Sequence, residues 1–142
     1  MNSGYTTQSP EETIALGRSL AAQFASPQLV LLRGELGAGK TTLVKGIAEA
    51  FDAAKQEEVT SPTFTLIHEY RGHEITIYHI DLYRIDTERE LATLGIDDLL
   101  RDQHNLVLIE WGEKFPRFVA ERDVEIAFER TGDSERRITL SR

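Results

Sequence analysis

Eight consecutive residues carry the clearest chemistry in the sequence: Gly34-Glu35-Leu36-Gly37-Ala38-Gly39-Lys40-Thr41. They fit the phosphate-binding pattern G-x-x-x-x-G-K-[ST] at every defined position. The glycines let the backbone curl until its N–H groups point at phosphate oxygens, and the helix that follows adds its own unpaired N–H groups. The lysine of this pattern reaches the β- and γ-phosphates, and the next hydroxyl binds Mg²⁺. The stretch therefore predicts a nucleoside triphosphate site, with Lys40 on the phosphates and Thr41 on the metal.

The residues on either side predict the elements that must position this loop. Residues 29–32 are all apolar, as in a strand buried on both faces. After the loop, Val44, Ile47, Ala48 and Phe51 fall at i, i+3, i+4 and i+7, which places them on one face of a helix. Strand, loop and helix in this order are the setting that the phosphate-binding pattern requires.

Two acids follow apolar runs and are candidates to complete the site. Residues 75–80 lead to Asp81, and residues 106–109 lead to Glu110. Ligands of open α/β sheets bind outside the carboxyl ends of the strands, so either acid could hold Mg²⁺ directly or through water. Each could instead cap a helix or pair with an arginine. Glu110 is favoured because its strand is the more completely apolar, and Trp111 beside it is expected at the mouth of the site.

The segment before the central strand is predicted to form a helix. Ser9 is placed as its N-cap, Pro10 at its first position, and Glu12 closes a capping box. An apolar residue then recurs every four positions and predicts a buried stripe: Leu16, Leu20 and Phe24. Residues 26–27, Ser-Pro, are expected to end the helix. Residues 6–7, two threonines before the cap, are interpreted from the pattern alone as a solvated tail.

Short strands are predicted in the second half of the chain. Residues 60–63 are rich in hydroxyls and contain a proline, which indicates a loop. Strands are predicted over 64–70 and 75–80, joined as an antiparallel hairpin, and the chain closes with a second hairpin over 124–128 and 138–140.

A short helix is predicted between the two hairpins. Thr87 with Glu90 forms a capping box, Gly95 is expected to end this helix, and residues 96–100 are expected to form one further helical turn. The four histidines lack the spacing of metal ligands or of a nucleophile's partner and are interpreted as structural: His68, His73, His79 and His104.

Composition limits the remaining classes of function. The 142 residues fit one domain spanning 1–142, and the absence of cysteine excludes disulfides and thiol catalysis. A formal net charge of −8 disfavours direct binding of DNA or RNA and favours a protein partner. No apolar run reaches membrane-spanning length, and the N-terminus shows no secretory signal, so a cytoplasmic protein is expected.

Three functions are compatible with the phosphate loop. There is no Asn-Lys-x-Asp to read guanine and no D-x-x-G switch, which disfavours a Ras-like GTPase. The favoured interpretation is a slow ATPase, because the sequence places no arginine as an obvious finger and intrinsic hydrolysis should therefore be slow. One alternative is a small kinase that phosphorylates a metabolite or a protein hydroxyl, although no insertion is long enough to form a lid. Another is a binding module that responds to ATP binding rather than to hydrolysis.

Four blocks of the sequence resemble the TsaE family, the bacterial ATPases of tRNA threonylcarbamoyladenosine biosynthesis. The blocks are GELGAGKTT (34–42), SPTFTL (61–66), YHIDLYR (78–84) and IEW (109–111). Their order and spacing agree with the family, and the second and third blocks are far more specific than the phosphate loop. The resemblance covers nearly the whole chain.

The resemblance implies a fold and a working context. The fold is α/β, a single-domain P-loop NTPase-like fold whose mixed parallel and antiparallel sheet is flanked by helices. The family acts with the proteins TsaD and TsaB, which transfer a threonylcarbamoyl group to adenosine 37 of tRNA. The resemblance implies that hydrolysis of ATP, with Mg²⁺, would be weak in the protein alone and stimulated by these partners. It would reset their complex between turnovers, and tRNA would be reached through the partners.

The resemblance also implies roles for individual residues. Thr41 and Glu110 would hold Mg²⁺, Asp81 would support the site, and Trp111 would lie beside it. Residues 61–65 would act as a nucleotide-sensitive switch. The expected nucleotide-binding residues come from the phosphate loop and, near the adenine, from both ends of the chain: Gly37, Ala38, Gly39, Lys40, Thr41, Thr42, Thr7 and Arg136.

Overall fold

A seven-stranded mixed sheet forms the centre of the protein in a computed structural model that describes residues 2–24 and 28–142. The strand order is β1-β7-β6-β2-β5-β4-β3. β2 pairs in parallel with β5 and β6, and β5 with β4, whereas β1-β7, β6-β7 and β3-β4 are antiparallel pairs. The strands are β1 (Asn2–Thr7), β2 (Gln28–Arg33), β3 (Ile67–Arg71), β4 (Thr76–Asp81), β5 (Asn105–Glu110), β6 (Val124–Arg130) and β7 (Arg136–Ser141). The predicted mixed sheet is confirmed.

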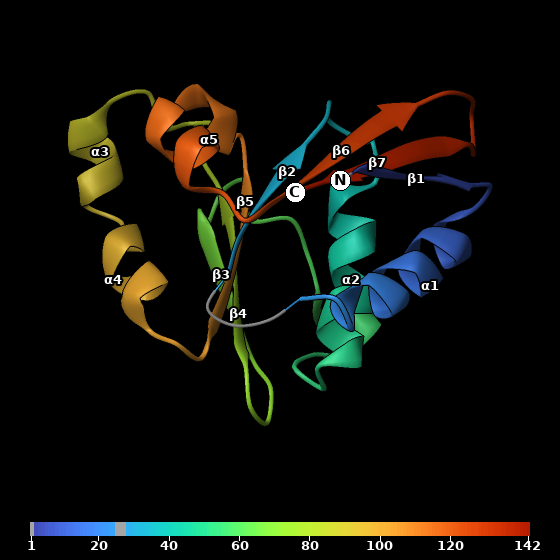
Figure 1. The fold of residues 1–142 in the computed structure, drawn as a ribbon, viewed down its shortest axis with the longest axis horizontal. Helices are drawn as coiled ribbons and strands as arrows, with labels where there is room; N and C mark the ends of the chain where they lie inside the picture. The colour runs from blue at the N-terminus through green and yellow to red at the C-terminus, as the bar shows by residue number, and fades with distance from the viewer. Residues whose placement is uncertain (1, 25–27) are drawn as a thin grey trace.

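Helices cover both faces of this sheet (Figure 1). α1 and α2 lie on one side, and α3, α4 and α5 lie on the other. The helices are α1 (Pro10–Ala21), α2 (Lys40–Ala50), α3 (Glu88–Ala92), α4 (Ile96–Arg101) and α5 (Pro116–Glu121), with short 3₁₀ turns η1 (Gln56–Glu58) and η2 (Gly112–Lys114). No helix within the described ranges is long and apolar enough to span a membrane.

The central strand β2 explains why the sequence before the phosphate loop is apolar without interruption. Val30 and Leu32 belong to the hydrophobic cluster under α1 and α2. Leu29 and Leu31 belong to the cluster on the opposite face, under α3 to α5. Alternate side chains of one strand thus enter two separate cores, so a polar residue at any of these positions would be buried.

Two glycines bring α1 and α2 into close contact. A Cβ atom at Gly17 would lie 2.3 Å from the backbone oxygen of Leu43, and one at Gly46 would lie 2.0 Å from that of Ile14. Both distances are far inside van der Waals contact, so the helices can pack at this separation only without side chains there. This packing fixes α2, and with it the end of the phosphate loop, against the N-terminal helix.

Three details of the predicted secondary structure are wrong. The predicted solvated tail is strand β1, in which Thr7 pairs with Arg136 of β7. Strand β3 begins at Ile67, and Phe64 lies outside it with 78% of its surface exposed. Gly95 does not end α3 but is the N-cap of α4, with a left-handed φ of 68°. Pairing between distant segments decides the first of these, and local propensity does not reveal it.

Several other elements agree with the predictions made from the sequence. Both predicted hairpins are present, as β3-β4 and β6-β7. The N-cap of α1 forms as expected, because the Ser9 hydroxyl accepts a hydrogen bond from the Glu12 N–H group. The predicted helix end at residues 26–27 lies outside the described residues, and α1 itself ends at Ala21. Helix α5 was not predicted.

Candidate functional site

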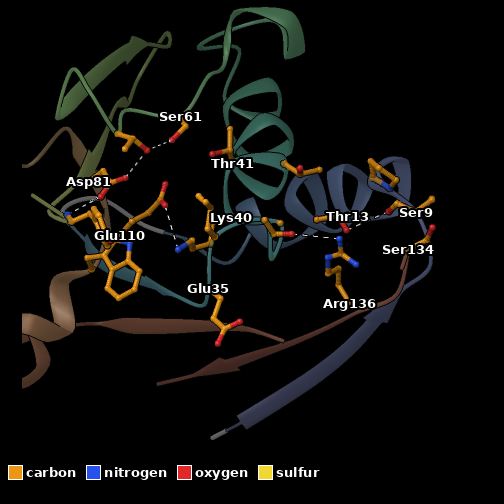
Figure 2. A pocket seen from close by; sticks show the side chains of 18 of the residues that line it. Ser9, Thr13, Glu35, Lys40, Thr41, Ser61, Asp81, Glu110, Ser134 and Arg136 are labelled. Carbon is orange, nitrogen blue, oxygen red and sulfur yellow. Dashed lines mark hydrogen bonds and ion pairs between the residues drawn. The ribbon is translucent and has the colours of Figure 1, made fainter. Parts of the chain in front are cut away.

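The carboxyl ends of three parallel strands meet at one edge of the sheet. The phosphate loop follows β2, Asp81 is the last residue of β4, and Glu110 is the last residue of β5. In the strand register, Glu110 lies beside both Leu32 and Asp81. A cavity of about 600 Å³ opens at these strand ends and is lined by the loop, the start of α2 and the two acids (Figure 2).

The loop needs glycine at positions where the backbone is left-handed or closely packed. Gly39, the N-cap of α2, has a φ of 106°, a conformation that residues with a Cβ atom rarely adopt. At Gly34, a Cβ atom would lie 2.8 Å from the backbone oxygen of Phe128 on β6. The loop is therefore seated against the sheet as well as curled around the start of the helix.

Lys40 points into the cavity from the first position of α2, although only 6% of its surface is exposed. Its Nζ donates a hydrogen bond to the Gly34 backbone oxygen at 2.5 Å and lies 3.6 Å from Oε1 of Glu110. It also lies 5.2 Å from the centroid of the Trp111 ring. The ammonium group is thus held at the base of the loop by a carbonyl, a carboxylate and an aromatic face.

Glu110 is buried and charged. Its Oε2 lies 2.5 Å from Nε2 of His79, a fully buried side chain on β4. Burial alone would raise the pKa of the Glu110 carboxyl. The hydrogen bond and charge of His79, together with the charge of Lys40, outweigh burial and hold that pKa below its ordinary value of 4.5. Glu110 is therefore a carboxylate at neutral pH, able to accept hydrogen bonds or bind a cation.

Asp81 is tied to the loop that precedes β3. Its Oδ1 accepts a hydrogen bond from the Tyr83 N–H group at 2.8 Å, and its Oδ2 accepts one from the Thr63 hydroxyl at 3.1 Å. Thr63 in turn shares a 2.7 Å hydrogen bond with the hydroxyl of Ser61. Asp81 thus connects residues 61–65 to the edge of the sheet on which Glu110 lies.

Trp111 has an unusual backbone at the mouth of the cavity. Its φ of 63° is left-handed, which for a bulky residue costs about 1–3 kcal/mol. In this conformation the centroid of its ring lies 5.2 Å from the centroid of the Tyr83 ring, and the ring faces the Lys40 ammonium group. The two aromatic rings form one wall of the cavity beside the lysine.

The far end of the cavity is built from both ends of the chain (Figure 2). Arg136, the first residue of β7, donates a hydrogen bond to the Gly37 backbone oxygen at 3.4 Å. Thr13, on α1, lines the cavity, and its hydroxyl shares a 2.8 Å hydrogen bond with the buried Thr7 hydroxyl. Thr7 is thus behind the wall rather than in it.

The structure brings together most of the residues that the sequence nominated. Two of them do not line the cavity: Ala38 is a buried residue of the loop, and Thr7 lies buried behind Thr13. The following predicted residues line the cavity: Gly37, Gly39, Lys40, Thr41, Thr42, Asp81, Glu110, Trp111 and Arg136.

Several residues of the site were not predicted from the sequence. The far end of the cavity is lined by Ser9, Thr13 and Ser134. His79 does not line the cavity but contacts Glu110, which does. The only available signal for His79 was its spacing of two residues from Asp81, which places both side chains on one face of a strand. The others depend on β1 and β7 lying next to each other, which the sequence did not reveal.

Comparison with known proteins agrees with this geometry. The family model for the threonylcarbamoyl adenosine biosynthesis protein TsaE matches residues 7–138. The tRNA threonylcarbamoyladenosine biosynthesis protein TsaE of Bacillus subtilis is 41% identical over 138 residues, covering 96% of this chain and 84% of that protein. The protein of the same name from Rickettsia conorii is 36% identical over 132 residues, covering 93% and 74% of the two chains.

A solved structure shows the same fold. The crystal structure of Bacillus subtilis YdiB matches with a TM-score of 0.77 at 34% identity, covering 99% of this chain and 84% of that one. The family match, over residues 7–138, includes the phosphate loop and both strand-end acids. The chain belongs to the TsaE family.

Proposed function

We propose that this protein is the ATPase of the tRNA threonylcarbamoyladenosine machinery, binding Mg-ATP in the cavity and hydrolysing it slowly. The observation that carries the proposal is the position of Lys40. It starts α2 at the end of a phosphate loop, at the carboxyl ends of the parallel strands of the sheet, with its Nζ 3.6 Å from Oε1 of Glu110. Membership of a family whose relatives are named for this biosynthesis supports the biological context.

The donors around Lys40 suit Mg²⁺. Proteins hold this ion through one or two carboxylates and complete its shell with substrate phosphates and water. Among the described residues, no cluster of three or more acids or histidines could hold a metal alone, which agrees with a site shared with phosphates. Thr41 and Glu110 would supply the protein oxygens, and Asp81 would support them. The metal would neutralise charge on the phosphates as the bond breaks.

The chain's own residues then have distinct tasks in hydrolysis. The N–H groups of the loop and the start of α2 would bind the phosphates, and Lys40 would exchange its contact with Glu110 for a phosphate oxygen. Through the metal that it holds, Glu110 would also order the attacking water. Trp111 and Tyr83 would shield this end of the cavity from bulk solvent.

The position of the cavity's arginine supports slow hydrolysis in the absence of partners. Arg136 is the arginine that lines the cavity within the described part of the chain, and it lies at the far end. One of its nitrogens already donates to the backbone oxygens of Gly132, Asp133 and Glu135. A missing arginine finger lowers hydrolysis rates by several orders of magnitude. We propose that TsaD and TsaB stimulate the reaction, that hydrolysis resets their complex, and that tRNA contacts belong to them.

A titration with ATP tests the site. Lys40→Ala removes a charge-assisted contact worth about 1.5–3 kcal/mol, so the Kd for Mg-ATP should rise about 10- to 100-fold. Lys45→Ala is the matched control, because Lys45 lies on the same helix but donates to the Gln56 backbone oxygen outside the cavity. Equal affinity of both variants and the unmodified protein would contradict the proposed site.

A further inference from the structure

His79 is a buried polar side chain with no role in the steps of hydrolysis proposed above. It is 0% exposed, and its Nε2 lies 2.5 Å from Oε2 of Glu110. Its other nitrogen, Nδ1, has no hydrogen-bond partner among the described residues. Burying an imidazole with one unpaired nitrogen costs free energy that an apolar side chain would not. The hydrogen bond to Glu110 is thus the interaction that compensates for part of this cost.

The strand register keeps the two side chains together. His79 pairs with Leu108, and Asp81 pairs with Glu110, on the neighbouring parallel strands β4 and β5. His79 is therefore the diagonal neighbour of Glu110 on the same face of the sheet, two register positions before the Asp81–Glu110 pair at the cavity. Both backbones are fixed by the ladder, so the ring approaches Glu110 from the side opposite the cavity.

The two oxygens of the Glu110 carboxylate have different partners. A carboxylate that serves as a metal ligand can only accept hydrogen bonds, so Nε2 of His79 is the donor in this contact. This hydrogen bond occupies Oε2, while Oε1 lies 3.6 Å from Nζ of Lys40, a separation too long for a hydrogen bond. Lys40 alone would therefore leave the carboxylate free to turn, and His79 supplies the contact that sets its orientation.

We propose that His79 is the positioning residue of the site: its Nε2–H group holds Oε2 of Glu110 so that Oε1 faces Lys40 and the metal. The inference rests on the proposed function, in which Glu110 acts on Mg-ATP. Hydrogen-bond partners of metal ligands orient them, and their loss typically lowers metal affinity or activity by about 10- to 100-fold. We expect an effect of that size at His79.

Two substitutions separate positioning from simple packing. In His79→Gln, the side-chain amide nitrogen is as many bonds from the backbone as Nε2 of histidine, so the donor to Glu110 is kept. In His79→Leu, the site stays filled but the donor is lost. Ile77→Val is the control, because Ile77 is a buried residue on the same strand and face that belongs to the hydrophobic cluster under α1 and α2.

The test measures hydrolysis with TsaD and TsaB present, together with two binding constants. These are the Kd for the non-hydrolysable analogue AMPPNP and the affinity for Mn²⁺ in the presence of AMPPNP, followed by electron paramagnetic resonance. His79→Leu should lower kcat and the Mn²⁺ affinity about 10- to 100-fold while the AMPPNP Kd in Mg²⁺ changes much less. His79→Gln should stay close to the unmodified protein in both, and Ile77→Val should lose thermal stability but not kcat.

A leucine variant with the kcat and Mn²⁺ affinity of the unmodified protein would overturn the positioning role. So would a glutamine variant as impaired as the leucine variant while both remain folded. These results differ from a failure of the proposed function itself, in which the unmodified protein would show neither hydrolysis nor binding of AMPPNP. If the leucine variant does not fold, the comparison of His79→Gln with His79→Asn decides, because asparagine is too short to reach Glu110.

Discussion

Nζ of Lys40 and Oε1 of Glu110 lie 3.6 Å apart, with 6% and 5% of their side chains exposed. One belongs to the helix after the central strand and the other to the end of the neighbouring strand, so the sheet itself sets their separation. Each charge compensates the other in a setting where either alone would be costly to bury. A triphosphate with its metal offers both of them alternative partners, which makes this pair the centre of the proposed site.

Glu110→Gln should separate binding from hydrolysis. The substitution keeps the size of the side chain and removes its charge, so kcat should fall about 10²- to 10³-fold, the usual loss when one group that stabilises charge in the transition state is removed. The Kd for AMPPNP should change little, since the loop and Lys40 remain. Steady-state hydrolysis and a binding titration measure the two effects.

Glu121→Gln is the matched control for that substitution. Glu121 is an exposed residue at the end of α5, beside the starts of β2 and β5 rather than their ends. It should retain the full rate. If Glu110→Gln also kept the full rate, Glu110 would have no role in hydrolysis.

The lowered pKa of Glu110 makes stability depend on pH in a defined direction. Burial raises this pKa, but the contacts with His79 and Lys40 lower it overall, below 4.5. A carboxyl whose pKa is lower folded than unfolded contributes stability above its unfolded value and loses that contribution as pH falls through its folded value. Urea unfolding should therefore show a stability advantage over Glu110→Gln at neutral pH that shrinks below about pH 4.5. An advantage that grew on acidification would contradict this sign.

Thr63→Val should release the loop over residues 61–65. It removes the hydroxyl that donates to Asp81 at 3.1 Å and leaves a side chain of the same shape, at a cost of about 0.5–1.5 kcal/mol. Hydrogen–deuterium exchange in this loop should become faster, and its slowing by AMPPNP should weaken. Thr65→Val is the control, since the Thr65 hydroxyl pairs with His68 instead. Equal exchange in both variants would show that Asp81 does not hold the loop.

Gly46→Ala should destabilise the protein through the contact between α1 and α2. The new Cβ atom would lie 2.0 Å from the Ile14 backbone oxygen, so the helices must separate. Overpacking of this kind costs about 1–3 kcal/mol or more, and it also moves the helix that carries Lys40. Gly4→Ala serves as the control, because nothing lies within 4 Å of its Cβ position. Equal midpoints of chemical unfolding would argue against the close packing.

The site residues that could be predicted are those specified by local pattern. Lys40 and Thr41 follow from eight consecutive letters, and Glu110 follows from an apolar run that ends in an acid. The contact of His79 with Glu110 could not be predicted, because it joins residues 31 apart in the chain and depends on strand register. Strand β1 was missed for the same reason, since its partner β7 is at the other end of the chain.

The most direct test is ATP hydrolysis by the purified protein, alone and with TsaD and TsaB from the same source. The proposed function predicts a low basal rate that increases when both partners are present and is lost in Lys40→Ala. Appearance of the phosphate on an acceptor other than water would instead indicate a kinase. A rate that TsaD and TsaB leave unchanged would contradict a coupled role in tRNA modification, even if ATP binding at Lys40 were intact.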